Sequence, residues 1–235
     1  MQSRSDLLNE LVVANRILAT QGVVDAYGHI SVRISSDRFL LSRARAPECV
    51  EPADIMEFDF SGSAIDAQDR KPYLERFIHA AIYEVRPDVN SIVHNHSHAL
   101  LPFGVIGKPL RPIAHTATMI GKHVPVWDCS EVFGDTDLLV SNMDMGRDLA
   151  RRLGAHTVAL MRGHGATVTG RSIREAVHTS VYLQLNADLQ FKATLLAEGG
   201  SIRFLSDGEI DASNAIYTPT SYDRAWEIWR RLANI

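Results

Sequence analysis

Residues 89–98, "VNSIVHNHSH", constrain the fold most, because an apolar run turns there into alternating histidines. The apolar start predicts a buried β-strand. Alternate residues of a strand point to the same face, so His94, His96 and His98 would line one face while the chain stays extended. Histidine is the commonest ligand of divalent metals in proteins. The segment therefore predicts a strand with metal ligands along one face.

A third ligand is expected from "MRGHGAT", residues 161–167, where His164 stands between two glycines. Residues 157–170 predict a strand, a glycine turn and a second strand, and glycine lets such a turn approach a ligand closely. Three histidines with an open position are typical of a catalytic metal site. A lone His-x-His strand is more often incidental, and the Gly-His-Gly hairpin favours the metal. His98 falls near the expected strand end, so a role beside the ligands and a structural role both stay open.

Glu75 lies in "KPYLERFIH", at the start of a helix expected over residues 73–86. A carboxylate in the first helical turn is stabilised by the helix dipole, and taken alone this is the simpler interpretation. The alternative is a general acid/base, or a transient metal ligand, beside the histidines.

The remaining periodicities predict a mixed sheet flanked by helices, because strands and helices alternate without a strict βαβ order. We expect the α/β chain 1–235 to form a single domain. The other expected elements are helices over 4–22, 141–153 and 172–199, strands over 28–35, 38–44 and within 54–66, and a short final helix with Trp226 and Trp229.

Composition excludes several classes of function. The net charge of -4 gives no basic footprint, so nucleic acid is not an expected partner. No apolar run approaches the roughly 20 residues of a membrane span, so no membrane association is expected. The N-terminus lacks the apolar core of a signal peptide, and Cys49 and Cys129 lie far apart. We therefore expect a cytoplasmic protein with reduced thiols.

Three segments together resemble the class II aldolase/adducin family: "YGHISVR", "KPYLERFIHAAIYEVRPDVNSIVHNHSHA" and "LMRGHGATVTGRSIREAV". The resemblance covers about residues 5–200. It implies an αβα sandwich with a mixed, largely antiparallel central sheet, and a homotetramer with active sites at subunit interfaces. It also implies that His94, His96 and His164 bind a divalent ion and that Glu75 is the catalytic acid/base.

The chain departs from the family's aldolases at three positions that hold a sugar phosphate. His29 replaces an Asn, "SRARAP" (42–47) replaces a Thr-Gly pair, and Tyr73-Leu74 replaces a Ser-Ser pair. Arginine suits carboxylates, and a bulky apolar pair suits a flat ring. That Arg43 and Arg45 are merely solvent-exposed loop charges stays open. The expected substrate contacts are Ser42, Arg43, Arg45, Tyr73, Leu74, His98 and His115, the last by its position in the family near a neighbouring subunit's site.

These departures favour decarboxylation of an ortho-hydroxy aromatic or hydroxypyridine dicarboxylate, a reaction found in the family, with Mn²⁺ or Zn²⁺. The ion would stabilise charge that develops when CO₂ leaves. Glu75, assisted by His29 or His98, would protonate the ring carbon, for which partial burial should raise its pKa. The alternatives are a sugar-phosphate aldolase or dehydratase, and a non-enzymatic adducin-like interaction module. His79 and His178 are expected to be structural.

Overall fold

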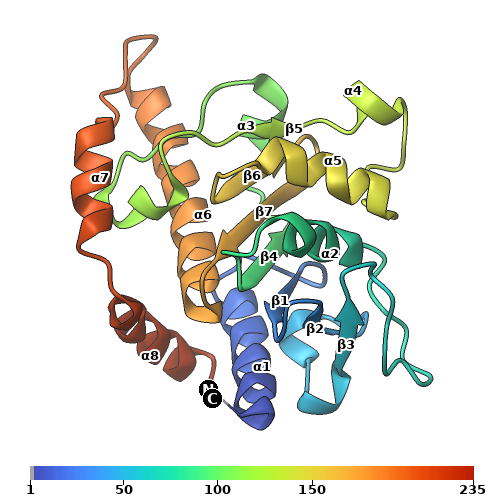
Figure 1. The fold of residues 1–235 in the computed structure, drawn as a ribbon. Helices are drawn as coiled ribbons and strands as arrows, with labels where there is room; N and C mark the ends of the chain where they lie inside the picture. Colours follow the sequence, from blue (N-terminus) through green and yellow to red (C-terminus); the bar gives the residue numbers. More distant parts are fainter. Residues whose placement is uncertain (1–2) are drawn as a thin grey trace.

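A seven-stranded sheet in the order β3-β2-β1-β4-β7-β6-β5 forms the centre of the computed structural model, which describes residues 3–235 (Figure 1). Every neighbouring pair is antiparallel except β5 and β6, which are parallel. The predicted mixed, largely antiparallel sheet is therefore confirmed. The strands are β1 (His29–Arg33), β2 (Arg38–Ser42), β3 (Ile55–Asp59), β4 (Ser91–Asn95), β5 (Val126–Trp127), β6 (Val158–Met161) and β7 (Gly165–Gly170).

Helices cover both faces of the sheet, as the sandwich prediction requires (Figure 1). The α-helices are α1 (Arg4–Thr20), α2 (Arg76–Val85), α3 (Leu101–Ile106), α4 (Ser130–Phe133), α5 (Met143–Leu153), α6 (Ile173–Leu196), α7 (Asp207–Ala215) and α8 (Asp223–Leu232). Short 3₁₀ turns are η1 (Pro47–Cys49), η2 (Pro52–Asp54), η3 (His115–Ile120) and η4 (Pro219–Tyr222).

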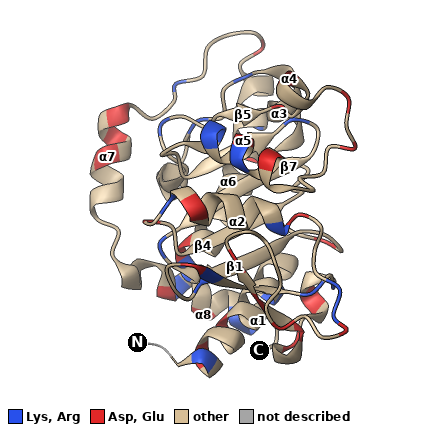
Figure 2. Ribbon diagram, turned by 45° about the vertical axis from the view of Figure 1, so that its right-hand side comes forward, with Lys and Arg blue, Asp and Glu red and all other residues tan. Residues whose placement is uncertain are grey.

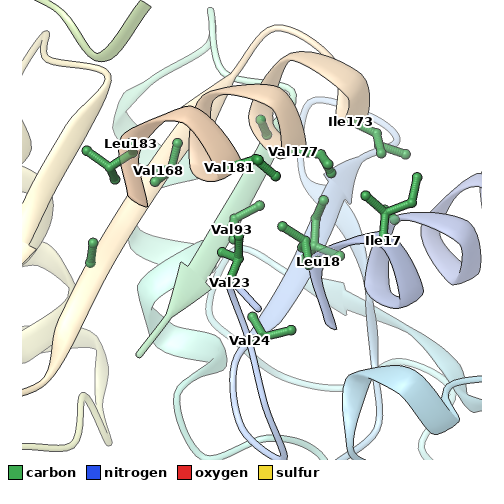
Figure 3. Close-up of a cluster of buried hydrophobic side chains, with 14 of the residues drawn as sticks. Ile17, Leu18, Val23, Val24, Val93, Val168, Ile173, Val177, Val181 and Leu183 are labelled. Carbon is green, nitrogen blue, oxygen red and sulfur yellow. The ribbon is translucent and has the colours of Figure 1, made fainter. Parts of the chain in front are cut away.

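The core between α1, α6 and the sheet is apolar. Figure 3 shows Ile17 and Leu18 of α1, Val93 of β4, and Val177 and Val181 of α6 gathered in one cluster. These side chains are at most 3% exposed. Burying each of them contributes about 1.5–3 kcal/mol, so this layer supplies much of the free energy that holds the sheet.

A second core lies under α2 and α5. The two helices approach closely at Gly146, where an added Cβ would lie 2.5 Å from the carbonyl oxygen of Phe77. Ile92 belongs to this core and Val93 to the opposite one, so strand alternation turns His94 toward α2. The packing of α2 thus brings its first residues over the histidine strand.

Two boundaries differ from the sequence-based expectation in ways that matter for function. β4 ends at Asn95, so His98 follows in a turn and does not continue the strand face. α2 begins at Arg76, so Glu75 is its N-cap residue and not part of its first turn. Helices α3, α4 and α7 were not predicted.

Charged residues of both signs are interspersed over the ribbon, and acidic residues gather on α7 (Figure 2). Among residues 3–235, no helix is both long and apolar enough to cross a bilayer.

Candidate active site

The imidazoles of His94, His96 and His164 converge on one point. His96 Nε2 lies 2.9 Å from His94 Nε2 and 3.0 Å from His164 Nε2. His94 is the penultimate residue of β4, and His164 is in the turn between β6 and β7. The structure therefore brings together the three predicted ligands.

Glycine makes this meeting possible. A Cβ at Gly165 would lie 2.0 Å from the carbonyl oxygen of Asn95, so any side chain there would push the hairpin off β4. Gly163, on the other side of His164, has a φ of +67°, which L-residues with a side chain rarely adopt. The two glycines of "GHG" thus seat His164 against the histidine strand.

Glu75 completes the cluster. Its Oε2 lies 3.4 Å from His94 Nε2 and 3.5 Å from His164 Nε2, and its Oε1 accepts a hydrogen bond of 3.0 Å from the Val140 N–H. The carboxylate caps no amide of α2. Glu75 instead lies within the histidine cluster, and its role in acid/base chemistry stays a prediction.

The electrostatics of Glu75 differ from the expectation of a raised pKa. Burial raises the pKa of its carboxyl, but His94 and His164 outweigh burial and hold the pKa well below its usual range. Glu75 is therefore an anion in this arrangement. Such a carboxylate is suited first to accept a proton, and only then to return it.

The donor set fits a divalent cation. His94 Nδ1 lies 3.2 Å from the carbonyl oxygen of Ala166, and because a carbonyl only accepts, the hydrogen is on Nδ1 and the Nε2 lone pair faces the cluster. Burial, then His94 and His164, lower the pKa of His96 to about 4, so its imidazole is neutral near pH 7. The ligand atoms of these histidines and Glu75 all lie within 4.8 Å of one another. A cation satisfies such convergent lone pairs, and nitrogen ligands at about 2.0–2.1 Å require only a slight outward movement of the rings.

His29 lies beside the cluster. Its ring centroid is 5.2 Å from that of His94 and 4.5 Å from that of Tyr73, and its Nδ1 is 2.7 Å from His79 Nε2. Burial, and after it His79 and His94, lower its pKa well below the usual value. His29 is thus a neutral imidazole next to the ligands.

Arg43 and Arg45 share one buried carboxylate. Arg43 Nε is 2.5 Å from Asp54 Oδ1, and Arg45 Nη1 is 2.6 Å from Asp54 Oδ2. Burial raises the Asp54 pKa, but Arg43, the Glu51 backbone N–H and Arg45 together lower it. The arginines are held side by side, so they are not free loop charges.

Tyr73 links these arginines to the histidines. Its hydroxyl donates to the carbonyl oxygen of Arg45, and its ring lies against His29. Ser42 is buried, and Leu74 is 48% exposed.

His98 and His115 are outside the four-residue cluster. Both are exposed. His98 lines a cleft of about 370 Å³ together with His96, Asp25 and Asp188. His115 begins η3, which packs on α6 and α7.

Sequence reasoning missed Val140 and Asp54, which reach Glu75 and the arginines across the chain and leave no local pattern. His79 carried a signal, since it follows Glu75 by four residues on α2 and therefore shares its helical stripe.

Residues 9–191 match the class II aldolase and adducin N-terminal domain family, so the chain belongs to that family. The decarboxylase tropJ of Talaromyces stipitatus is 36% identical to it over 92% of this chain and 89% of its own length. The 3,4-dihydroxyphthalate decarboxylase of Arthrobacter keyseri is 28% identical over 90% of this chain and 89% of its own. The fold is shared with the L-fuculose 1-phosphate aldolase from Glaciozyma antarctica, with a TM-score of 0.78 and 22% identity over 98% of this chain and 89% of that one.

Proposed function

We propose that this protein is a divalent-metal-dependent decarboxylase of a hydroxylated aromatic dicarboxylate. The observation that carries the proposal is the convergence of His94, His96, His164 and Glu75. The similarity to decarboxylases over most of the chain supports the same reaction class.

The three histidines would hold the ion, and when bound it would act as a Lewis acid that stabilises negative charge on the substrate. Both Mn²⁺ and Zn²⁺ accept imidazole and carboxylate ligands, and we propose one of them.

Glu75 would move the proton. As an anion it would accept the proton of the ring hydroxyl next to the scissile carboxylate, and then give that proton to the ring carbon. The bond between that carbon and the carboxylate breaks, CO₂ leaves, and the bond's electron pair restores the aromatic ring. The oxygen that lost its proton regains one from water.

The arginine pair would bind the carboxylate that is not lost. Asp54 neutralises one of the two positive charges, so the pair presents a net charge near +1 to an anion. Tyr73 and Leu74 would flank the ring, with Ser42 behind them. His29 would contact the substrate next to the ion.

Our specific proposal for the substrate is 3-hydroxy-2-methylpyridine-4,5-dicarboxylate, an intermediate of bacterial vitamin B6 degradation. It has a hydroxyl ortho to one carboxylate and a second carboxylate beside it. A sugar-phosphate aldolase or dehydratase is the second candidate, because the fold is shared with an aldolase. The arginines and Tyr73-Leu74 in place of small polar residues favour the decarboxylase. An adducin-like interaction module would have no need of the four-residue cluster.

We also propose a homotetramer in which a neighbouring subunit completes each site. The cleft at His96 and His98 is open to solvent at the edge of the ligand cluster, where a second chain would cover it. His115 would then approach the site of a neighbouring subunit.

The test is CO₂ release from a panel of ortho-hydroxy aromatic and pyridine mono- and dicarboxylates, with metal-stripped protein to which Mn²⁺ or Zn²⁺ is added back. Metal-dependent release from a dicarboxylate is expected. Cleavage of a sugar phosphate, with no CO₂ from any acid, would replace the decarboxylase by the aldolase.

A further inference from the structure

A row of four polar side chains runs through the interior between β1 and α2. His29 Nδ1 is 2.7 Å from His79 Nε2, His79 Nδ1 is 2.6 Å from Ser31 Oγ, and Ser31 Oγ is 2.8 Å from the Tyr83 hydroxyl. None of the four is more than 2% exposed. Polar groups buried this deeply cost free energy unless every hydrogen bond is made, so a row in an otherwise apolar interface calls for a function.

The row begins at the active site. His29 and Ser31 alternate on β1 and so share a face, which is the face that α2 covers. His79 and Tyr83 follow Glu75 at four-residue intervals and so share its stripe on α2. The same side of α2 therefore places Glu75 in the cluster and His79 next to His29.

The chemistry of the four groups sets the direction of their hydrogen bonds. A phenol is a stronger acid than an alcohol, and the Arg33 guanidinium 4.8 Å over the Tyr83 ring makes the phenol oxygen a poorer acceptor. The Asn90 carbonyl oxygen also lies near the Tyr83 hydroxyl, but at 3.5 Å it is at the limit of a hydrogen bond, whereas Ser31 Oγ is at 2.8 Å. Tyr83 thus donates to Ser31, and Ser31 donates to His79 Nδ1. Because a neutral imidazole has one donor and one acceptor, His79 then donates from Nε2 to His29 Nδ1.

This order leaves the ring hydrogen of His29 on Nε2. That nitrogen makes no hydrogen bond to any residue from 3 to 235, and the ring packs between His94 and Tyr73. Nε2–H is therefore a free donor beside the metal ligands.

We propose that His79 is a positioning residue that fixes His29 as a neutral Nε2–H donor toward a substrate oxygen. The inference rests on the proposed decarboxylase and assigns His29 a narrower role than proton transfer. A neutral imidazole N–H is a very weak acid, so it stabilises the developing charge on oxygen by a hydrogen bond, while Glu75 moves the proton. Donors held in place before the reaction stabilise such charge most effectively.

The properties of the buried groups agree with a static row. Burial lowers the pKa of His79 to about 3 and raises the pKa of the Tyr83 hydroxyl well above its usual value. Both groups therefore remain neutral over the working range of pH, and the row orients His29 without passing a net proton to it.

The matched variants are His79→Gln and His79→Asn. The amide group of Gln reaches about as far as imidazole Nε2 and can still bond to His29, whereas that of Asn reaches only as far as Nδ1 and can bond only to Ser31. We expect His79→Asn to lower kcat for CO₂ release about ten- to hundredfold with little change in KM, and His79→Gln to keep most of the activity. Equal losses in both variants would mean that His79 only fills space, and would overturn the proposal.

A second readout does not depend on the reaction. Long-range ¹H–¹⁵N spectra of histidine-labelled protein, metal-free and zinc-loaded, should show His29 in one neutral form with hydrogen on Nε2, and a mixture of forms in His79→Asn. Hydrogen on Nδ1 in the wild type would overturn the proposal. Absence of CO₂ release with the expected spectra would count against the decarboxylase alone.

Should both His79 variants fail to fold, Ser31→Ala removes a single oxygen from the row. We expect it to mix the two neutral forms of His29 and to lower kcat as His79→Asn would. An unchanged His29 spectrum in folded Ser31→Ala would show that the row does not set the form of His29.

Discussion

The two faces of the central sheet differ on β1 and β4, because polar side chains interrupt the apolar core on the α2 side only. Toward α1 and α6, β1 and β4 present Ile30, Val32 and Val93, which belong to one apolar cluster. Toward α2, the same strands present His29 and His94, opposite each other in the β1–β4 register. Because side chains alternate along a strand, a slip of one residue would exchange the faces. Burial of the apolar cluster under α1 and α6 therefore fixes the β1–β4 register, and this register places His29 opposite His94.

We therefore expect stability and chemistry to be separable in this part of the molecule. Changes to the polar side chains on the α2 side should remove activity and leave the fold, and changes to the apolar cluster under α1 and α6 should do the reverse.

Removing a metal ligand should have the largest effect. We expect His96→Ala to lose the ion and to lower turnover at least about thousandfold, because Lewis-acid stabilisation is worth several kcal/mol and each 1.4 kcal/mol is tenfold in rate. Metal content and CO₂ release measured on the same preparation check this. His98→Ala, two residues further along the chain but outside the cluster, is the control for metal content. A stoichiometric ion in folded His96→Ala would remove this residue from the ligand set.

Glu75→Gln should come next. The amide oxygen can still accept from the Val140 N–H, so the side chain should stay in place and the ion should remain bound. We expect kcat to fall about 10²–10⁴-fold, the usual contribution of a general acid/base. Turnover near that of the wild type, with metal content also unchanged, would assign the proton transfer to another group.

On the apolar face, Ile17→Ala should destabilise the fold by about 2–5 kcal/mol, as expected when a fully buried aliphatic side chain is cut back. Denaturant unfolding measures the loss, and kcat per folded molecule should be unchanged. A fall in kcat that exceeds the unfolded fraction would show that the two faces are coupled.

His178 provides a second test of the apolar side of the molecule, through the pH dependence of the unfolding free energy. It is buried between α6 and α8 beside Tyr222 and Trp229, and burial lowers its pKa from 6.5 to about 4. As the pH falls, the unfolded chain therefore binds this proton at a higher pH than the folded chain does. The contribution of His178 to the unfolding free energy is full above pH 6.5 and is lost as the pH falls toward 4. Its size is about 3 kcal/mol at most, from 1.36 kcal/mol per pKa unit. The unfolding free energy of His178→Gln should depend less on pH in this window, and an identical pH dependence would exclude His178 as the source.

How far the sequence could predict the site depended on how local each signal was. The alternation of His94 and His96 and the glycines around His164 are local, and the structure brings these residues together. No clear local signal marks the end of β4 at Asn95. The sequence therefore placed His98 near the strand face of His94 and His96, whereas it lies in the turn that follows. That Glu75 lies within the histidine cluster follows from the packing of α2 and not from any local pattern. Asp54 and Val140 act across the fold, and no spacing in the sequence points to their partners.

The smallest effect is expected at Arg43 and Arg45, whose side chains are partly exposed to solvent. Arg43→Ala should raise KM for a dicarboxylate roughly five- to tenfold, since charged hydrogen bonds of partly exposed groups contribute modestly. KM for a monocarboxylate should change less, because that substrate lacks the second anion. Lys122→Ala, which removes an exposed basic residue that pairs with Asp211, is the control for net charge. Equal KM changes for the two substrates would mean that Arg43 does not contact the second carboxylate. The hydrogen bond of 2.5 Å from Arg43 Nε to Asp54 would then serve the fold only, and Arg43 would have no part in substrate binding.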